Sequence, residues 1–209
     1  AANDTNKIRT LERALKRTQA VPERTVVKIL VWNDLDMELT EGWNLQVLRV
    51  TLPEPVTRAR LEEGGTADYS GAPDARPFGA ALQQPGLQVI AEIKRRSPSA
   101  GVLAADLDPV RQSREYARGG AAAISVLTEP DYFGGSLRDL VAVRHAVDLP
   151  ILRKDFIIDP RQVIESRLAG ADALLLIVAA LDRAKLQQLL AECAKTGIEA
   201  LVEAHDRAE

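Results

Sequence analysis

From residue 87 onward, apolar stretches of strand length alternate with amphipathic stretches of helix length. The apolar stretches are nearly continuous, which is typical of parallel strands that are covered on both faces. Their spacing leaves room for one helix and two short loops per repeat, as in successive βαβ units. The predicted strands are 89–94, 123–128, 150–155, 173–178 and 199–204.

The stretches between these strands are predicted to be crossover helices. Each begins with an Asp or Ser that can cap a helix N-terminus, and three end on glycine. Parallel strands joined in this way form either a closed β/α barrel or an open doubly wound sheet. Neither a G-x-G-x-x-G fingerprint nor a P-loop follows any predicted strand, which disfavours a nucleotide-binding open sheet. The predicted helices are 108–120, 136–147, 159–170 and 182–197.

The N-terminal third of the chain has a different pattern. Residues 4–19 suit a helix, and residues 25–52 suggest strands around a turn at 41–44. Residues 62–77 are rich in Gly, Pro, Asp and Ala, which indicates a linker.

Composition narrows the class of protein. The chain has 209 residues, of which 46% are hydrophobic and 27% charged, enough for a folded domain with a core. A net charge of -3 gives no cationic surface for nucleic acid. Without an apolar run of about 18 residues, and with a charged start, neither a membrane span nor a secretory signal is expected. We therefore expect a cytoplasmic protein.

Charged residues interrupt the predicted strands at their C-terminal ends. Glu92 and Lys94 are two residues apart, so they lie on the same side of their strand. Lys154 and Glu203 end two further strands in the same way. Buried charges are costly unless they are paired or functional, and in a β/α barrel these strand ends meet at one mouth. The cluster therefore predicts an acid–base site, the alternative being paired charges at the rim without chemistry.

Other residues near the predicted mouth suggest substrate contacts. Ser97 follows the first strand in a Ser-Pro-Ser segment that suits a phosphate. Phe133 and Phe156 follow the second and third strands, while Leu175 and Ile177 share one face of the fourth. These four side chains can line a pocket for a flat aromatic group or can belong to an ordinary core.

Several segments resemble the indole-3-glycerol-phosphate synthase family, whose members are ribulose-phosphate-binding β/α barrels. The resemblance covers about residues 76–209, in order, and the combination of EIKRRSPS with LRKDF is specific. It implies a parallel TIM-type barrel over 76–209, preceded by an unassigned extension over 1–75. The matching segments are PGLQVIAEIKRRSPSAG, ISVLTEPDYFGGS, LPILRKDFIIDPRQV, GADALLLIVAAL and LEALVEAHD.

The resemblance also implies a reaction. The substrate would be 1-(2-carboxyphenylamino)-1-deoxyribulose 5-phosphate, which closes its ring with loss of carbon dioxide and water, without a metal or organic cofactor. Lys154 would be the general acid, Lys94 would hold the carboxylate or donate a proton, and Glu92 would orient Lys94. Glu203 would serve the later proton transfers and Ser97 would contact the phosphate. The hydrophobic pocket would be lined by Phe133, Phe156, Leu175 and Ile177.

The chain departs from the family by ending after the fifth strand, whereas the family continues through three more. We therefore predict an open barrel whose first and fifth strands are unpaired edges, and we expect it to self-associate. One alternative function is a non-catalytic fragment that needs a partner chain. Another is a different phosphate-binding barrel, such as phosphoribosylanthranilate isomerase, which the EIKRRSPS and LRKDF segments disfavour.

Overall fold

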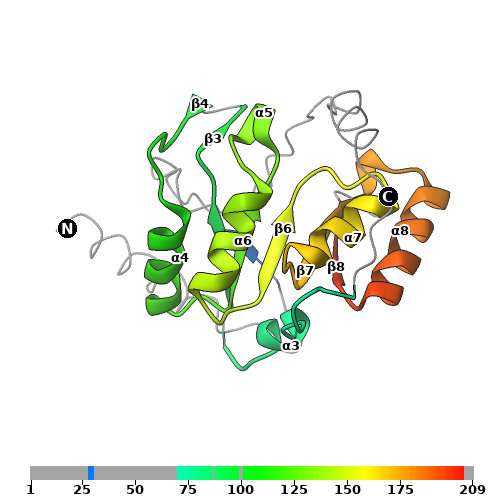
Figure 1. The fold of residues 1–209 in the computed structure, drawn as a ribbon, viewed down its shortest axis with the longest axis horizontal. Helices are drawn as coiled ribbons and strands as arrows, with labels where there is room; N and C mark the ends of the chain where they lie inside the picture. Colours follow the sequence, from blue (N-terminus) through cyan, green and yellow to red (C-terminus); the bar gives the residue numbers. More distant parts are fainter. Residues whose placement is uncertain (1–27, 31–69, 87, 99–100, 205–209) are drawn as a thin grey trace.

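The computed structural model describes residues 28–30, 70–86, 88–98 and 101–204. Its main feature is a six-stranded sheet in which every neighbouring pair is parallel (Figure 1). The strand order is β1-β2-β5-β6-β7-β8. The strands are β1 (Lys28–Leu30), β2 (Val89–Ile93), β5 (Ala123–Leu127), β6 (Ile151–Lys154), β7 (Ala173–Ile177) and β8 (Glu199–Glu203).

The order of the strands distinguishes the two architectures that the sequence allowed. Within this sheet, each strand from β2 to β8 pairs with the sheet's next strand in sequence, and the strand order does not reverse as it does in a doubly wound sheet. Consecutive parallel pairing is the arrangement of a TIM-type barrel. All five predicted strands are confirmed, with ends that differ by no more than one residue.

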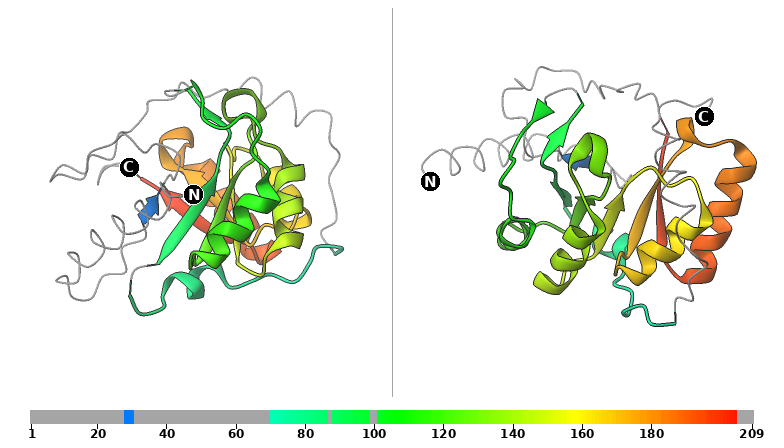
Figure 2. Two further views of the ribbon diagram at one scale, coloured as in Figure 1. Left: turned by 90° about the vertical axis from the view of Figure 1, so that its left-hand side faces the viewer. Right: turned by 45° about the horizontal axis from the view of Figure 1, so that its top comes forward.

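Helices cover the outer face of this sheet, as Figures 1 and 2 show. The predicted caps are confirmed, because the side chains of Asp108, Ser136, Asp159 and Asp182 each accept a hydrogen bond from a backbone N–H in the first turn. The four predicted helices are α4 (Pro109–Arg118), α6 (Leu137–Ala146), α7 (Pro160–Leu168) and α8 (Arg183–Thr196).

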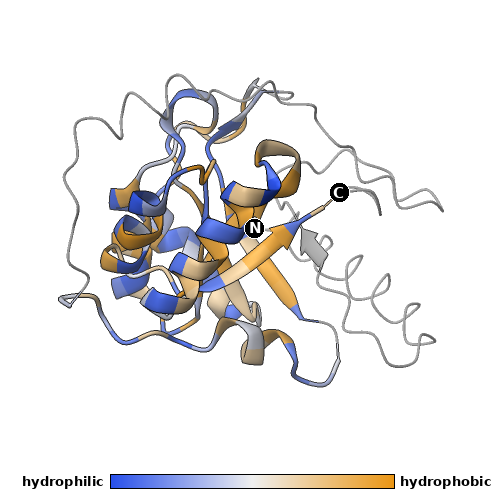
Figure 3. Cartoon of the chain, turned by 90° about the vertical axis from the view of Figure 1, so that its right-hand side faces the viewer, coloured by the Kyte–Doolittle hydropathy of each residue, from blue (hydrophilic) through white to orange (hydrophobic). Residues whose placement is uncertain are grey.

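The two faces of the sheet build two apolar layers, and Figure 3 shows apolar residues concentrated on the strands. Alternate residues such as Ile124 and Leu174 face outward and pack with the helices. The other set, formed by Ile90, Ala123, Leu152 and Ala173, packs with Phe78 and Leu82 of the short helix α3 (Phe78–Leu82). We call this second set the inner apolar layer. It lies at the end of the sheet where the strands begin.

Four short elements were not predicted. They are α3, the hairpin of β3 (Arg96–Ser97) and β4 (Gly101–Val102), the one-turn helix α5 (Pro130–Phe133) and a 3₁₀ turn at Val178–Ala180. The hairpin and α5 follow β2 and β5, so both lie at the end of the sheet where the strands finish (Figure 1).

The prediction that the first strand would be an unpaired edge of the sheet was wrong. Residues 28–30 form β1, which pairs with β2 in parallel and so satisfies that side of the strand. At the other side of the described sheet, β8 pairs with β7 alone, and Val202 is 44% exposed. The helix predicted at 4–19, the turn at 41–44 and residues 62–69 of the linker lie outside the described residues.

Candidate active site

The charged side chains predicted on two strands meet on the inner face of the sheet. Glu92 is 2% exposed, and its Oε2 accepts a hydrogen bond from Lys154 Nζ at 2.8 Å. Its Oε1 lies 3.5 Å from Lys94 Nζ. A buried carboxylate between two ammonium groups is paired on both sides, which is the arrangement expected of a proton-exchanging cluster. We call Glu92, Lys94 and Lys154 the mouth cluster.

Strand alternation explains why these side chains converge. Ile90 and Leu152 belong to the inner apolar layer, so Glu92 and Lys154, two residues further along each strand, also face inward. The strand β5 separates β2 from β6, and Lys154 spans it to reach Glu92. Lysine has the length for this, because its four-carbon stem carries the ammonium well away from the backbone.

A buried tyrosine supports β2 from behind the mouth cluster. Tyr116 of α4 donates a hydrogen bond from its hydroxyl to the Glu92 backbone oxygen at 3.1 Å. Burial raises the pKa of Tyr116 to about 12, and the nearby Glu92 charge adds to the shift. The hydroxyl therefore stays protonated at neutral pH and keeps donating to β2.

A buried polar network supports Lys154, and the sequence did not reveal it. Arg153 and Asp155 flank Lys154 and point to the opposite face. Asp155 Oδ2 accepts from Thr128 Oγ1 at 2.6 Å and from Arg153 Nη2 at 3.0 Å, while Arg153 Nη1 donates to Glu165 Oε2 at 2.7 Å. The network ties the end of β6 to β5 and α7. The charged run Arg-Lys-Asp was its only sequence signal.

The two predicted aromatic residues lie together at this end of the sheet. The rings of Phe133 and Phe156 have centroids 6.4 Å apart and are tilted by 47°, a geometry that favours aromatic contact. Phe133 ends α5, whose first turn is capped by the carboxylate of Glu129 through three backbone N–H groups. Gly134 then closes the helix at φ +65°, a conformation that favours glycine.

Of the remaining predicted site residues, Ile177 and Glu203 end their strands, Leu175 is the middle residue of β7, and Ser97 lies beyond the end of β2. Leu175 is 1% exposed on β7, and Ile177 pairs in register with Glu203 of β8. Ser97 is 6% exposed on β3. The structure thus brings Glu92, Lys94 and Lys154 into direct contact, and Phe133 against Phe156, while no contact of the other four with these residues is described.

Arg95, next to the mouth cluster, is ion-paired. Its guanidinium binds both carboxylate oxygens of Asp139, at 2.6 and 3.0 Å. The hydrogen bond to Asp139 raises the pKa of Arg95. This pair links the loop after β2 to the start of α6.

A second buried carboxylate lies at the opposite end of the sheet. Asp172 precedes β7, and its Oδ2 accepts from Arg144 Nη1 at 2.6 Å and from Ile151 N at 2.8 Å. Its Oδ1 accepts from Arg76 N at 2.7 Å. The Arg76 side chain donates to backbone oxygens of residues 147 and 149. We call Asp172, Arg144 and Arg76 the floor cluster.

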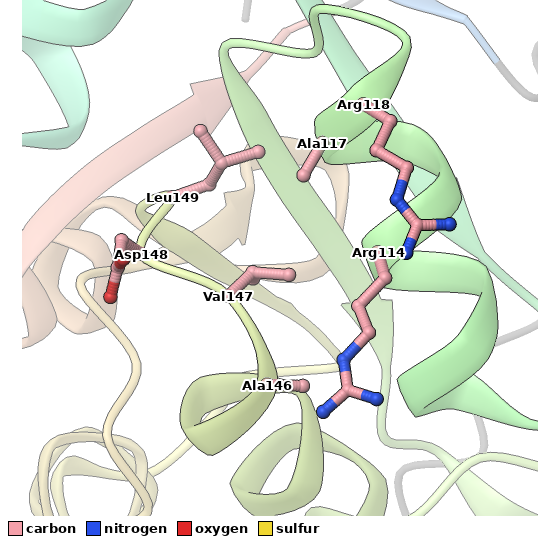
Figure 4. A pocket seen from close by; sticks show the side chains of 7 residues that line it. All are labelled: Arg114, Ala117, Arg118, Ala146, Val147, Asp148 and Leu149. Carbon is pink, nitrogen blue, oxygen red and sulfur yellow. The ribbon is translucent and has the colours of Figure 1, made fainter.

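A surface cleft of about 400 Å³ lies near the floor cluster rather than the mouth cluster (Figure 4). It is lined by Arg114 and Arg118 of α4 and by residues 146–149, which lead into β6. Its position at the N-terminal ends of the strands separates it from the predicted site residues.

Neither a metal-binding cluster nor a membrane-spanning helix is found in the part of the chain that the structure describes. Within the described ranges, no group of three or more His, Cys, Asp or Glu side chains is arranged to hold a metal ion. No helix in the same part of the chain is long and apolar enough to cross a membrane.

Consecutive parallel strands wrapped by helices, with charged side chains at the strand C-termini, define a protein of the β/α-barrel class. Residues 51–209 match the family model described as indole-3-glycerol phosphate synthase, and the chain belongs to this family. The resemblance stated from the sequence is therefore confirmed.

Individual relatives agree with this assignment. The chain is 63% identical over 164 residues to indole-3-glycerol phosphate synthase of Nocardioides sp., covering 78% of this chain and 62% of the relative. It is 54% identical over 153 residues to indole-3-glycerol phosphate synthase 2 of Streptomyces coelicolor, covering 73% and 58%. The chain thus spans about three fifths of these relatives. A solved mandelate oxidase variant aligns at a TM-score of 0.41 with 17% identity, over 59% of this chain and 43% of that one, which adds no argument.

Proposed function

We propose that the protein catalyses the indole-3-glycerol-phosphate synthase reaction on 1-(2-carboxyphenylamino)-1-deoxyribulose 5-phosphate. The observation that carries this proposal is the mouth cluster, in which one buried carboxylate holds two ammonium groups at 2.8 and 3.5 Å. Family membership supplies the reaction, and the cluster supplies groups able to perform its proton transfers.

The first step forms a carbon–carbon bond. The aromatic carbon that bears the carboxylate attacks the ribulose carbonyl carbon, and Lys154 donates a proton to the carbonyl oxygen, which becomes a hydroxyl. The carboxylate then leaves as carbon dioxide, and its bonding electrons restore the aromatic ring. Lys154 suits the acid role because its side chain remains 24% exposed while it is held by Glu92.

The second step removes water. Lys94 donates a proton to the departing hydroxyl, and Glu203 takes the proton from the neighbouring ring carbon, which completes the indole. Glu92 holds both lysines, so it orients the two acids for successive steps. The phosphate would be bound at Ser97, and the aromatic ring against Phe133, Phe156, Leu175 and Ile177. No cofactor takes part in this scheme.

The test is a fluorescence assay of indole-3-glycerol phosphate formation by the intact protein and by Lys154→Met. We expect turnover per folded molecule to fall at least about 100-fold in the variant, the scale of a lost general acid. Lys195→Met is the matched control, because Lys195 is 67% exposed on α8 and far along the chain from the cluster. Equal turnover in the two variants would remove Lys154 from the mechanism.

A second candidate function is association with another chain, and it concerns the 209-residue polypeptide taken alone. Because β8 has one neighbour among the described strands, its other edge can pair with a second chain. The proposal is self-association, or association with a partner chain that completes the barrel. Light scattering on a sizing column tests it, and a monomer at every concentration that also turns over substrate contradicts it. We further propose that the protein acts in the cytoplasm, since the sequence contains no apolar run of about 18 residues that could span a membrane.

A further inference from the structure

Two buried polar atoms on neighbouring strands lack hydrogen bonds within the described part of the chain. They are Oε1 of Glu92 and Oγ of Ser125. Ser125 is fully buried, at 0% exposure. Buried polar atoms are nearly always satisfied, and exceptions point to a bound water or a functional role. Neither the family resemblance nor the proposed mechanism gave Ser125 a role.

The sheet places these two atoms on the same face. Glu92 and Ser125 are register partners in the β2–β5 pair, and parallel strands lie about 4.8 Å apart. Ile90 and Ala123, two residues earlier on the same strands, both belong to the inner apolar layer. Alternation therefore directs Glu92 and Ser125 inward together, above that layer and below the mouth.

Their chemistry selects what can lie between them. A carboxylate oxygen only accepts hydrogen bonds, whereas a serine hydroxyl both donates and accepts. A water molecule can donate to Glu92 Oε1 and also pair with Ser125 Oγ. Lys94 Nζ, 3.5 Å from the same carboxylate oxygen, is a third polar neighbour. Buried waters typically make two to four such contacts, about three on average.

We propose that Glu92 and Ser125 bind one internal water molecule, through which Ser125 acts as a positioning residue for Glu92. The catalytic consequence rests on the proposed function. When Lys154 turns toward the substrate, Glu92 loses its donor at 2.8 Å. The water keeps a donor on the carboxylate and holds it in place for the return of Lys154.

If the Ser125 hydroxyl bound no water, its removal would have a different effect on stability. An unsatisfied hydroxyl in an apolar interior is unfavourable, so its replacement by a methyl group would stabilise the fold without affecting catalysis. Ser125→Thr and Ser125→Val form a matched pair, because they have nearly the same shape and differ in the hydroxyl. Ser125→Ala repeats the comparison without the added bulk.

The first measurement is kcat and KM for this pair in the intact protein. We expect kcat of Ser125→Val to be about tenfold below that of Ser125→Thr, the scale of one hydrogen bond to a charged group. KM should differ by less than about twofold, since the substrate contacts are unchanged. The thermal midpoint of Ser125→Val should not exceed that of Ser125→Thr, because the water satisfies the threonine hydroxyl. Equal kcat values in the pair would overturn the positioning role.

The second measurement does not depend on turnover. A high-resolution crystal structure of the unchanged protein should contain a water bridging Glu92 Oε1 and Ser125 Oγ, and one of Ser125→Ala should lack it. If the unchanged protein fails to convert the substrate, the proposed function fails while the water site still stands on this structure. Absence of the bridging water from the unchanged protein would overturn the site itself.

Discussion

The two ends of the sheet each contain a buried, ion-paired carboxylate, and they differ in how completely it is bound. At the floor, both oxygens of Asp172 accept hydrogen bonds, from Arg144, Ile151 and Arg76. At the mouth, one oxygen of Glu92 accepts from Lys154, and the other accepts none within the described residues. The floor cluster is saturated and the mouth cluster is not.

The two clusters also differ in their cations, which are arginines at the floor and lysines at the mouth. Arginine has a rigid fork of donors and does not release its proton in proteins, whereas lysine has a flexible stem and can exchange a proton. Arginines with a saturated carboxylate therefore fix backbone segments, and lysines around an incompletely bound carboxylate can perform acid–base chemistry. The floor end of the strands therefore serves stability, and the mouth end serves catalysis.

The largest effect on stability is expected from Asp172→Asn. Loss of the charge leaves Arg144 buried without its partner, which costs about 3–5 kcal/mol of unfolding free energy. Urea denaturation measures this change. Turnover per folded molecule should stay the same, since Asp172 is remote from the mouth. Asp148→Asn is the control, because that side chain is fully exposed at the edge of the same cluster.

Lys154→Arg should have the largest effect on turnover among conservative changes. The ion pair with Glu92 can persist, but the guanidinium does not release a proton, so kcat should fall at least about 100-fold. Unfolding free energy should change little. Lys195→Arg on α8 serves as the control. A variant with more than about a tenth of the normal rate would contradict the acid role, because proton donation would then be dispensable.

The reverse exchange at the floor, Arg144→Lys, should lower the stability of the fold and leave turnover unchanged. Arg144 binds Asp172 through Nη1 and the backbone oxygen of Asp74 through Nη2. A single ammonium group cannot match this forked geometry, so we expect a loss of about 1–3 kcal/mol. Arg118→Lys, on the exposed end of α4, is the control in thermal unfolding. Equal stability of the two variants would show that the fork is not needed.

The smallest effect is expected from Tyr116→Phe, which removes the hydroxyl that donates to the Glu92 backbone. One hydrogen bond is worth about 1 kcal/mol at neutral pH. The pKa of Tyr116 is raised from 10.0 to about 12 in the fold, so the unfolded chain releases this proton first. Stability present below pH 10 is therefore lost as pH rises to 12.

The variant should show a shallower loss of stability over that alkaline range. Urea titrations at successive pH values measure the slope, with Tyr132→Phe as the control because Tyr132 is 37% exposed. Identical slopes for the protein and for Tyr116→Phe would mean that the fold does not raise the pKa of Tyr116.

Long periodic elements were predictable from the sequence, whereas short ones were not. The strands and capped helices after residue 87 have patterns set by local geometry. The helix α3 has five residues, and it is held by packing of Phe78 and Leu82 into the inner apolar layer. Likewise, α5 depends on its Glu129 cap. Such long-range contacts leave little trace in a local pattern.

The candidate site shows the same division. Two charges on one face of an apolar strand were enough to find Glu92 and Lys94, and the end of β6 gave Lys154. Their supporting residues were missed, because Thr128, Tyr116 and Ser125 are common residue types whose importance comes from partners distant in the sequence. The roles of the predicted site residues, and the domain boundary at residue 76, stay predictions.

The inner apolar layer has a consequence for how such a protein can change over evolutionary time. Ile90, Ala123, Leu152 and Ala173 form an apolar stretch on the inner face of the sheet, below the mouth cluster. Substitutions at the mouth therefore act independently of the floor, since energetic effects of well-separated sites add. New specificities can be explored at one end while the other keeps the chain folded, which makes the barrel a tolerant scaffold for divergence.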